Sequence, residues 1–332
     1  MRVLILGGTV FLSAAIATEC LARGHDVTCL SRATNATPPR GARDVRADRS
    51  HGTGAYDAVR GEWDAVVDVA TDPRFVRDAL AALSERARHW TCVSSCSVYL
   101  DQDRPGGDET RAIHESLPES ETPTPENYGA SKAACEAACH RARGDDVLVV
   151  RPGLIVGPGD PSDRGGYWPA RFARDQGPVL VPEAKGLFAQ LIDVSDVASW
   201  IVECGESGTT GTMNAVGEPR RLSDVLEDVG LAVGLGANLV RVDDQWLLDH
   251  GVAPWSGPDS LPLWIPQGQG FDGFTTRSRV LASAHGLGQR DVADTVRDIL
   301  AYERIRGLER ERVAGLSAGT ETTLLSLWGG QT

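Results

Sequence analysis

The chain has 332 residues, of which 41% are hydrophobic, and a formal net charge of −13. This length allows one large α/β domain with a smaller partner, and the negative charge disfavours nucleic acid or an anionic membrane as a partner. No apolar run approaches the ~20 residues that cross a bilayer, and the first residues lack a signal-peptide pattern, so the sequence predicts a cytoplasmic protein.

The cysteines do not indicate a metal site. Cys92 and Cys96 are four residues apart, as are Cys135 and Cys139, whereas zinc ligands usually come as closer pairs with a distant second pair. We therefore expect the seven cysteines to be small apolar residues in a reduced cell. No bound metal is predicted.

The first half of the sequence alternates short β-rich runs with helical stretches. Strands are expected at residues 3–6, 27–30, 44–47, 65–69, 91–94 and 147–150, and helices at 11–23, 75–87 and 128–143. The strands are almost continuously apolar and β-branched, which is typical of parallel strands covered on both faces. This alternation predicts an α/β protein with a doubly wound parallel sheet.

The second half is less regular. A strand is expected at residues 191–194 and helices at 196–203, 291–306 and 320–328. Residues 255–273 gather prolines, glycines and tryptophans, which indicates a loop-built surface. Such a surface is either a pocket wall or an oligomer contact. We expect the protein to be a monomer or a homodimer.

A glycine-rich turn, Gly7-Gly8-Thr9-Val10-Phe11-Leu12-Ser13, follows the first expected strand. Strand, turn and helix in this order are the context of a dinucleotide site, because the helix N-terminus offers unpaired N–H groups to a pyrophosphate. The residues predicted to bind the cofactor here are Gly7, Thr9, Val10, Phe11 and Leu12. A GxxGxxG spacing would place further glycines where Val10 and Ser13 stand, so a purely structural turn remains the alternative.

The end of the second strand bears on the choice of cofactor. An acidic residue there would bind the adenosine ribose and favour NAD, whereas an arginine accommodates the 2′-phosphate of NADP. The position holds Ser31, followed by Arg32, so the sequence predicts NADP, with NAD possible and a solvated loop arginine as the alternative. Asp48, just past the third strand, is expected to meet the adenine amino group.

Tyr128 and Lys132 are four residues apart on an expected helix and therefore share one face. A nearby ammonium stabilises a phenolate, so a tyrosine in this setting can donate a proton to a carbonyl or remove one from an alcohol. Serines at residues 94–97 follow a central strand, where ligands bind in open parallel sheets. A hydroxyl there can hold the reacting oxygen or simply cap the strand end.

Four segments of the sequence, GGTVFLS, SSCSVY, YGASK and VRPGLIVGPGD, resemble the extended short-chain dehydrogenase/reductases of the NAD-dependent epimerase/dehydratase family. The resemblance is close over residues 1–215 and looser beyond. It implies that Tyr128 is the acid–base, that Lys132 orients the cofactor ribose, that Ser95 matches the catalytic serine or threonine, and that Gly7 contacts the pyrophosphate.

The resemblance also implies a division of the chain. Residues 1–153 are expected to form a Rossmann-type NAD(P)-binding domain, to which 187–228 partly return. Residues 154–186 and 229–332 are expected to form a smaller, irregular substrate-binding domain. Because Val10 and Ser13 stand where the family has glycines, a cofactor would lie slightly differently or bind less tightly.

The resemblance specifies the fold more closely than it specifies the reaction. Nucleotide-sugar epimerases of this family present an Asn and an Arg to the substrate diphosphate, where this sequence has Leu154 and Ala189. We expect NADPH-dependent reduction of a carbonyl in a small or natural-product metabolite of secondary metabolism. Two alternatives stay open: an epimerase or dehydratase with tightly bound NAD(P), and a cofactor-binding or cofactor-free isomerase or cyclase on the same fold.

Aromatic and basic residues of the second half could line the substrate pocket. Trp255, Leu263, Trp264 and Phe271 are expected to wall an apolar pocket or, alternatively, to pack the second domain's core or a dimer contact. The basic residues that could still contact a diphosphate are Arg164, Arg171 and Arg174.

Overall fold

The computed structural model describes residues 1–32, 34, 36–174, 177–234 and 238–330. In these ranges the largest sheet has seven strands, all paired in parallel. Their spatial order is β10 (Gly211–Ala215), β6 (Leu148–Pro152), β5 (Ala87–Val93), β4 (Trp63–Asp68), β1 (Arg2–Leu6), β2 (Asp26–Ser31) and β3 (Arg43–Arg46). From β1 the chain runs to β2 and β3 on one side and then crosses back to β4 on the other side of β1, so the predicted doubly wound sheet is confirmed.

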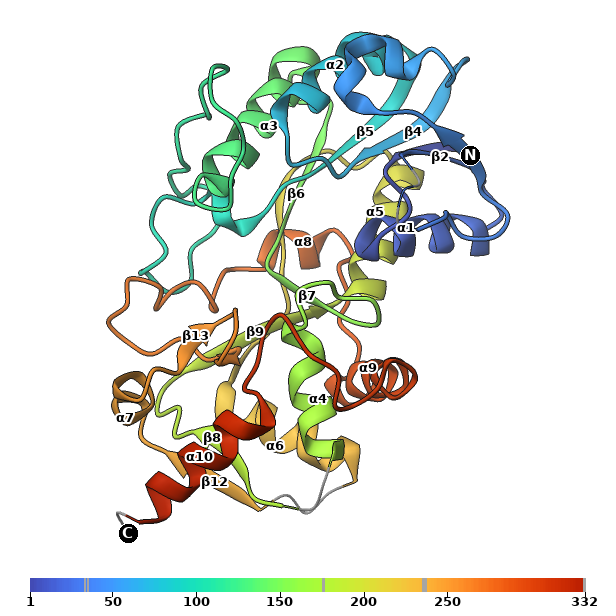
Figure 1. Ribbon diagram of the computed structural model, residues 1–332. Coiled ribbons are helices and arrows are strands. Elements are labelled where there is room, and N and C mark those ends of the chain that lie inside the picture. Colours follow the sequence, from blue (N-terminus) through green and yellow to red (C-terminus); the bar gives the residue numbers. More distant parts are fainter. Residues whose placement is uncertain (33, 35, 175–176, 235–237, 331–332) are drawn as a thin grey trace.

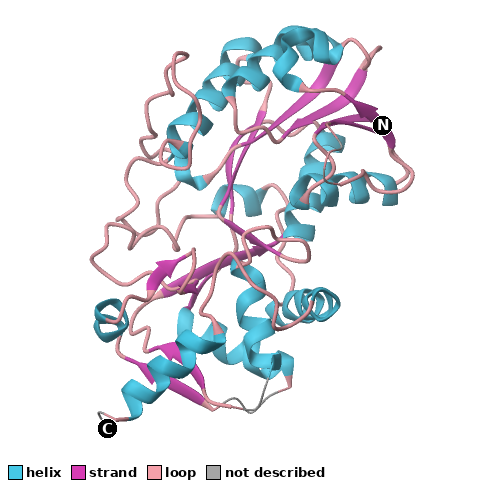
Figure 2. Cartoon of the chain, viewed as in Figure 1, coloured by secondary structure: helices cyan, strands magenta, loops and turns pink. Residues whose placement is uncertain are grey.

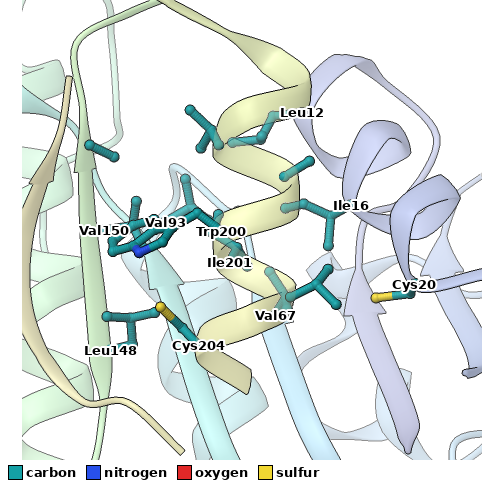
Figure 3. Close-up of a cluster of buried hydrophobic side chains, with 14 of the residues drawn as sticks. Leu12, Ile16, Cys20, Val67, Val93, Leu148, Val150, Trp200, Ile201 and Cys204 are labelled. Atoms are coloured by element: carbon teal, nitrogen blue, oxygen red, sulfur yellow. The ribbon is translucent and has the colours of Figure 1, made fainter. Parts of the chain in front are cut away.

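Helices cover both faces of this sheet (Figures 1 and 2). On one face lie α1 (Phe11–Ala22) and α5 (Val194–Ser207), and on the other lie α2 (Pro73–Leu83), α3 (Tyr128–Arg143) and the 3-10 segment η1 (Arg49–Tyr56). Figure 3 shows the side chain of Trp200 from α5 between α5 and the strands that carry Val93 and Val150. Trp200 is 1% exposed, so this contact removes a large apolar surface from water.

The helices begin where capping residues allow them to. The side chain of Asp72 accepts an N–H at the start of α2, and Asp193 does the same for α5. Such caps satisfy N–H groups that have no partner inside the helix. At the C-terminal end of α3, Gly144 has a φ of 62°, which ends the helix before the turn into β6.

One boundary predicted from the sequence is wrong. The helix expected to reach residue 87 ends at Leu83, and β5 begins at Ala87 instead of 91. Trp90 pairs with Val66 of β4 and is fully buried. Burial and strand pairing at Ala87 to Trp90 therefore override the local helical pattern.

The second half builds a smaller α/β layer below the sheet (Figure 1). Its strands are β7 (Leu154–Val156), β9 (Phe188–Asp193) and β11 (Pro219–Arg221) in one sheet, β8 (Val179–Pro182) with β12 (Leu239–Val242), and β13 (Ala253–Trp255) with β14 (Ser260–Pro262). Its helices are α4 (Arg164–Arg174), α6 (Leu222–Val233), α7 (Asp244–Asp249), α9 (Val292–Arg306) and α10 (Ala318–Gly329). The short helix α8 (Val280–Ala284) packs instead beside β10 of the large sheet. The helices expected at 291–306 and 320–328 correspond to α9 and α10.

The chain passes between the two layers more than once. β9 contains most of the strand expected at 191–194, but it pairs with β7 and β11 and does not join the large sheet. α5 and β10, which follow it, pack with the large sheet instead. No helix in the described ranges is long and apolar enough to cross a membrane.

Candidate active site

A cavity of about 680 Å³ lies at the carboxyl ends of the central strands. Its walls come from the turn after β1, the end of β5, the start of α3 and the loop between β7 and α4, and Trp255 and Phe274 close it from the second layer. This is the edge at which ligands bind in open parallel sheets. The cavity therefore brings sequence-distant segments to one place.

The turn after β1 needs its first two glycines. Gly7 has a φ of 134° and Gly8 one of 91°, a region that side chains other than hydrogen rarely allow. A Cβ atom on Gly8 would lie 2.4 Å from the sulfur of Cys29. The N–H of Gly7 donates to the carbonyl of Leu30 at 2.9 Å, which ties the turn to the end of β2.

Val10 and Ser13 fit the turn without blocking it. The Ser13 hydroxyl folds back, donating to the Val10 carbonyl at 2.7 Å and accepting the Val10 N–H at 3.4 Å, and Ser13 is 6% exposed. The Val10 side chain is 52% exposed. Phe11, which follows, has a φ of 42°, an uncommon value for a non-glycine residue. Thr9 is half-buried and is not among the residues that line the cavity.

The residues expected to meet the adenosine lie together at the ends of β2 and β3. Arg32 is exposed and follows Ser31, whose carbonyl accepts the N–H of Ala47 at 3.1 Å. Hydrogen bonds from Ser50, and with them the nearby charge of Arg32, hold the pKa of Asp48 below its usual range. The charge of Arg32 is thus near enough to act on the carboxylate of Asp48 at this end of the sheet.

Tyr128, Lys132 and Ser95 all line the cavity. Lys132 is 3% exposed, and its ammonium donates to the carbonyls of Ala70 at 2.8 Å and Val93 at 2.7 Å. Because an ammonium has three N–H donors, one remains for a ligand. Tyr128, half-buried on the same helix face, is the first residue of α3.

The approach of α3 to β5 depends on a glycine. A Cβ atom on Gly129 would lie 2.3 Å from the carbonyl oxygen of Ser97, so any larger residue would push the helix away. Before it, the side chain of Asn127 accepts the N–H of Thr124 at 2.7 Å and fixes the entry to the helix. Both features hold Tyr128 against the end of β5.

The serines after β5 have different surroundings. The hydroxyl of Ser94 donates to the buried carboxylate of Glu136, which also receives both arms of the Arg151 guanidinium, at 2.9 and 2.6 Å. The Ser94 hydroxyl is therefore already used in a buried hydrogen bond. Ser95 is half-buried, accepts the N–H of Ser97 at 3.1 Å and donates to its hydroxyl at 3.2 Å, a bond that a ligand oxygen can replace.

The aromatic residues of the second half divide between the two roles considered for them. Trp255 lines the cavity, and Phe274, which the sequence did not single out, packs against it with ring centroids 5.2 Å apart. Leu263 and Trp264 are buried in the core of the second layer. Phe271 is 47% exposed and not in the cavity wall.

The three arginines considered for a diphosphate also divide. Arg171 and Arg174 both contact the carboxylate of Glu321, at 2.5 and 3.1 Å, and neither lines the cavity. Arg164 does line it. The only sequence feature of Arg164 that could have indicated this is its place soon after the glycines that end β7.

A parallel sheet with a glycine turn after its first strand and a Tyr–Lys helix beside its central strand is the arrangement typical of dinucleotide-binding α/β proteins of the short-chain dehydrogenase/reductase type. Residues 68–215 match the NAD dependent epimerase/dehydratase family. This match agrees with the resemblance that the sequence segments carry.

Solved structures share the fold over nearly the whole chain. The UDP-glucuronic acid 4-epimerase of Bacillus cereus in complex with NAD is 14% identical, with a TM-score of 0.65 over 92% of this chain and 99% of that one. The UDP-glucose 4-epimerase of Thermus thermophilus, also with NAD, is 21% identical, with a TM-score of 0.60 over 92% and 99%. At these identities the likeness shows the fold.

A curated relative resembles part of the sequence. The ceramide reductase of Caulobacter vibrioides (strain NA1000 / CB15N) is 30% identical over 146 residues, which are 42% of this chain and 44% of that protein. The match therefore spans less than half of the relative's length.

Proposed function

We propose that the protein is an NAD(P)-dependent carbonyl reductase, or the reverse dehydrogenase, with NADPH as the preferred cofactor. The observation that carries this proposal is the cavity itself, which is lined by Tyr128, Lys132 and Ser95 together with the turn after β1. An acid–base group, a cation and a hydroxyl in one cavity are what proton transfer to a carbonyl oxygen requires.

The residues present fit a dinucleotide. At Gly7 and Gly8 no side chain stands in the way, and the Ser13 hydroxyl is turned into the helix start. The backbone N–H groups of Phe11 and Leu12 have no hydrogen-bond acceptor within the described chain, so they are available to a pyrophosphate. When bound, the nicotinamide would supply or accept the hydride.

The chain's own groups would manage the proton. The Tyr128 hydroxyl would donate its proton to the carbonyl oxygen of the substrate, and the Ser95 hydroxyl would hold that oxygen in place. Lys132, fixed by two carbonyls, would use its remaining N–H on the cofactor ribose and stabilise the phenolate left on Tyr128.

The second layer would supply the substrate wall. Arg164, Trp255 and Phe274 line the cavity and come from residues 154–186 and 229–332, the ranges expected to bind substrate. The relative that is named a reductase supports net reduction. The apolar Leu154 in the cavity wall supports a substrate without a diphosphate.

Net cofactor consumption tests the proposal. The full chain is mixed with NADPH and a panel of aromatic and aliphatic aldehydes and ketones, and the absorbance of the reduced cofactor is followed. A reductase consumes one NADPH for each alcohol formed. Copurified cofactor with no net consumption would instead favour the epimerase or dehydratase, and absence of cofactor binding in a titration would favour the cofactor-free isomerase or cyclase.

A further inference from the structure

Arg164 is held in the cavity wall by a rigid loop. The carboxylate of Asp160 accepts the N–H and hydroxyl of Ser162, at 2.8 and 2.7 Å, and the N–H of Gly165 at 3.0 Å. On the other side of the loop, Asp163 is 5% exposed and binds Arg310 and the N–H of Val313. Both anchors flank Arg164, so its backbone is fixed where α4 begins.

The guanidinium of Arg164 is oriented, but no described carboxylate contacts it directly. It lies 4.8 Å from the ring centroid of Trp255, and its Nε donates to the hydroxyl of Ser162 at 3.0 Å. Within the described residues it forms no ion pair, and its two terminal nitrogens have no hydrogen-bond acceptor. Burial lowers the pKa of Arg164, and the charges of Asp160 and Tyr128 only partly offset this effect.

Two largely buried arginines elsewhere in the chain have a carboxylate partner, whereas Arg277, also buried, donates to the carbonyl of Asp101 and the side-chain oxygen of Gln102. Arg49 meets Asp68 at 2.7 Å and Arg151 meets Glu136 at 2.6 Å. A partly buried cation without a counter-charge is unfavourable. The two terminal nitrogens of Arg164 are therefore available to a group that enters the cavity.

We propose that Arg164 binds a carboxylate of the substrate, so that the enzyme acts on oxo acids whose body is apolar. This inference rests on the proposed function, because it names the substrate of the same cavity. The planar guanidinium suits a bidentate carboxylate. The ring of Trp255 packs against the guanidinium, and the side chains of Leu154 and Phe274 supply the apolar wall.

A single carboxylate fits this site better than a phosphate group. Of the described residues that line the cavity, Lys132 and Arg164 are the cationic ones, and Lys132 already donates to two carbonyls. One guanidinium with two available nitrogens matches one carboxylate with two oxygens. A diphosphate would leave several charged oxygens against apolar side chains.

Binding of benzoate and benzamide tests the inference without turnover. The two compounds have nearly the same size and differ in charge. Calorimetry on the full chain, with and without saturating NADP⁺, should show benzoate binding about tenfold or more tightly than benzamide, as a charge-assisted hydrogen bond predicts. Arg164→Met should abolish the preference. Arg220→Met, which removes a surface arginine paired with Asp228, should keep it.

Turnover of a matched pair gives a second readout. The pair is 4-formylbenzoate and its methyl ester, both aldehydes. Arg164→Met should lower kcat/KM for the acid by about ten- to a hundredfold and leave that for the ester within about threefold. If neither aldehyde is reduced, the proposed function fails while the benzoate titration still decides the role of Arg164.

Three results would overturn the inference. One is equal or undetectable binding of benzoate and benzamide by the wild-type chain. Another is a benzoate preference that survives Arg164→Met. The third is a loss of NADPH affinity in Arg164→Met as large as the loss of benzoate affinity, because the arginine would then serve the cofactor.

Discussion

The ammonium group of Lys132 donates a hydrogen bond of 2.7 Å to the main-chain carbonyl of Val93. This bond joins the face of α3 that carries Tyr128 to the last residue of β5, two residues before Ser95. Lys132 therefore holds the candidate acid–base and the candidate oxygen-binding hydroxyl at the same end of the sheet. Its second bond, to Ala70, extends the connection to the loop after β4.

Replacing Lys132 should affect both stability and cofactor binding. Lys132→Ala leaves the carbonyls of Ala70 and Val93 without their donor, at a cost of about 1–3 kcal/mol for each in the free energy of unfolding. It also removes the N–H proposed for the cofactor ribose. Urea unfolding and NADPH titration measure the two effects. Lys185→Ala, which removes an exposed lysine, is the control. If Lys132→Ala unfolded at the same urea concentration as this control, the structural role of Lys132 would be contradicted.

Replacing Tyr128 should affect the reaction alone. Tyr128→Phe removes the hydroxyl but keeps the ring, so we expect almost complete loss of kcat with NADPH affinity close to that of the wild type. Tyr302→Phe, on α9 and outside the cavity wall, is the matched control. A general acid contributes about 10²–10⁴-fold, so retention of more than about a tenth of kcat would exclude that role for Tyr128.

Much of the large sheet could be predicted from the sequence because its strands are buried on both faces. Runs such as Val147 to Val150 are fully buried and apolar without interruption, a pattern that predicts a parallel strand covered on both faces. β10 was missed because its sequence, GTMNA, contains a glycine and an asparagine. The asparagine, Asn214, is buried and bonded to Tyr99 at 2.6 Å, a contact that only the fold reveals.

The candidate site was predictable to the extent that it depends on short spacings. Tyr128 and Lys132 lie one helical turn apart, so their spacing alone places them on one face. Arg164 and Phe274 reach the cavity from distant loops, and no local pattern connects them. The Trp255 and Trp264 side chains look alike in the sequence, yet one lines the cavity and the other is buried in the core.

Arg32 should determine the preference between the two dinucleotides. It is exposed at the end of β2, where a 2′-phosphate would add a charge-assisted hydrogen bond. We expect tighter binding of NADPH than of NADH by about ten- to a hundredfold. Arg32→Ala should narrow the difference by weakening NADPH alone. Fluorescence titration with both cofactors measures this difference in affinity, and Arg88→Ala is the control. Equal affinities of the wild type for NADPH and NADH would contradict the prediction.

The buried pair of Arg151 and Glu136 should be sensitive to the loss of one partner. Both side chains are almost fully buried, and Glu136→Gln leaves the guanidinium without a counter-charge. We expect a loss of about 3–5 kcal/mol in the free energy of unfolding. The double variant Glu136→Leu with Arg151→Met should recover a large part of it. A single variant as stable as the wild type would show that the pair is not required.

Nucleotide sugars should not bind the cavity usefully. Where related sugar epimerases are expected to present an Asn and an Arg to the diphosphate, this chain has Leu154, which lines the cavity, and Ala189, which is buried in β9. Neither side chain offers a donor, and a partly desolvated phosphate without partners is costly.

The arginines do not repair this deficit. Arg171 and Arg174 contact Glu321 outside the cavity wall, and Arg164 alone cannot satisfy two phosphates. Calorimetry of the cofactor-loaded protein with UDP and dTDP should therefore show no binding at ligand concentrations up to about 1 mM. The titration of Arg164→Met separates a contact with this residue from binding elsewhere. Micromolar affinity of the wild type for either nucleotide would restore the nucleotide-sugar epimerase hypothesis, because only a diphosphate site absent from the present assignment could produce it.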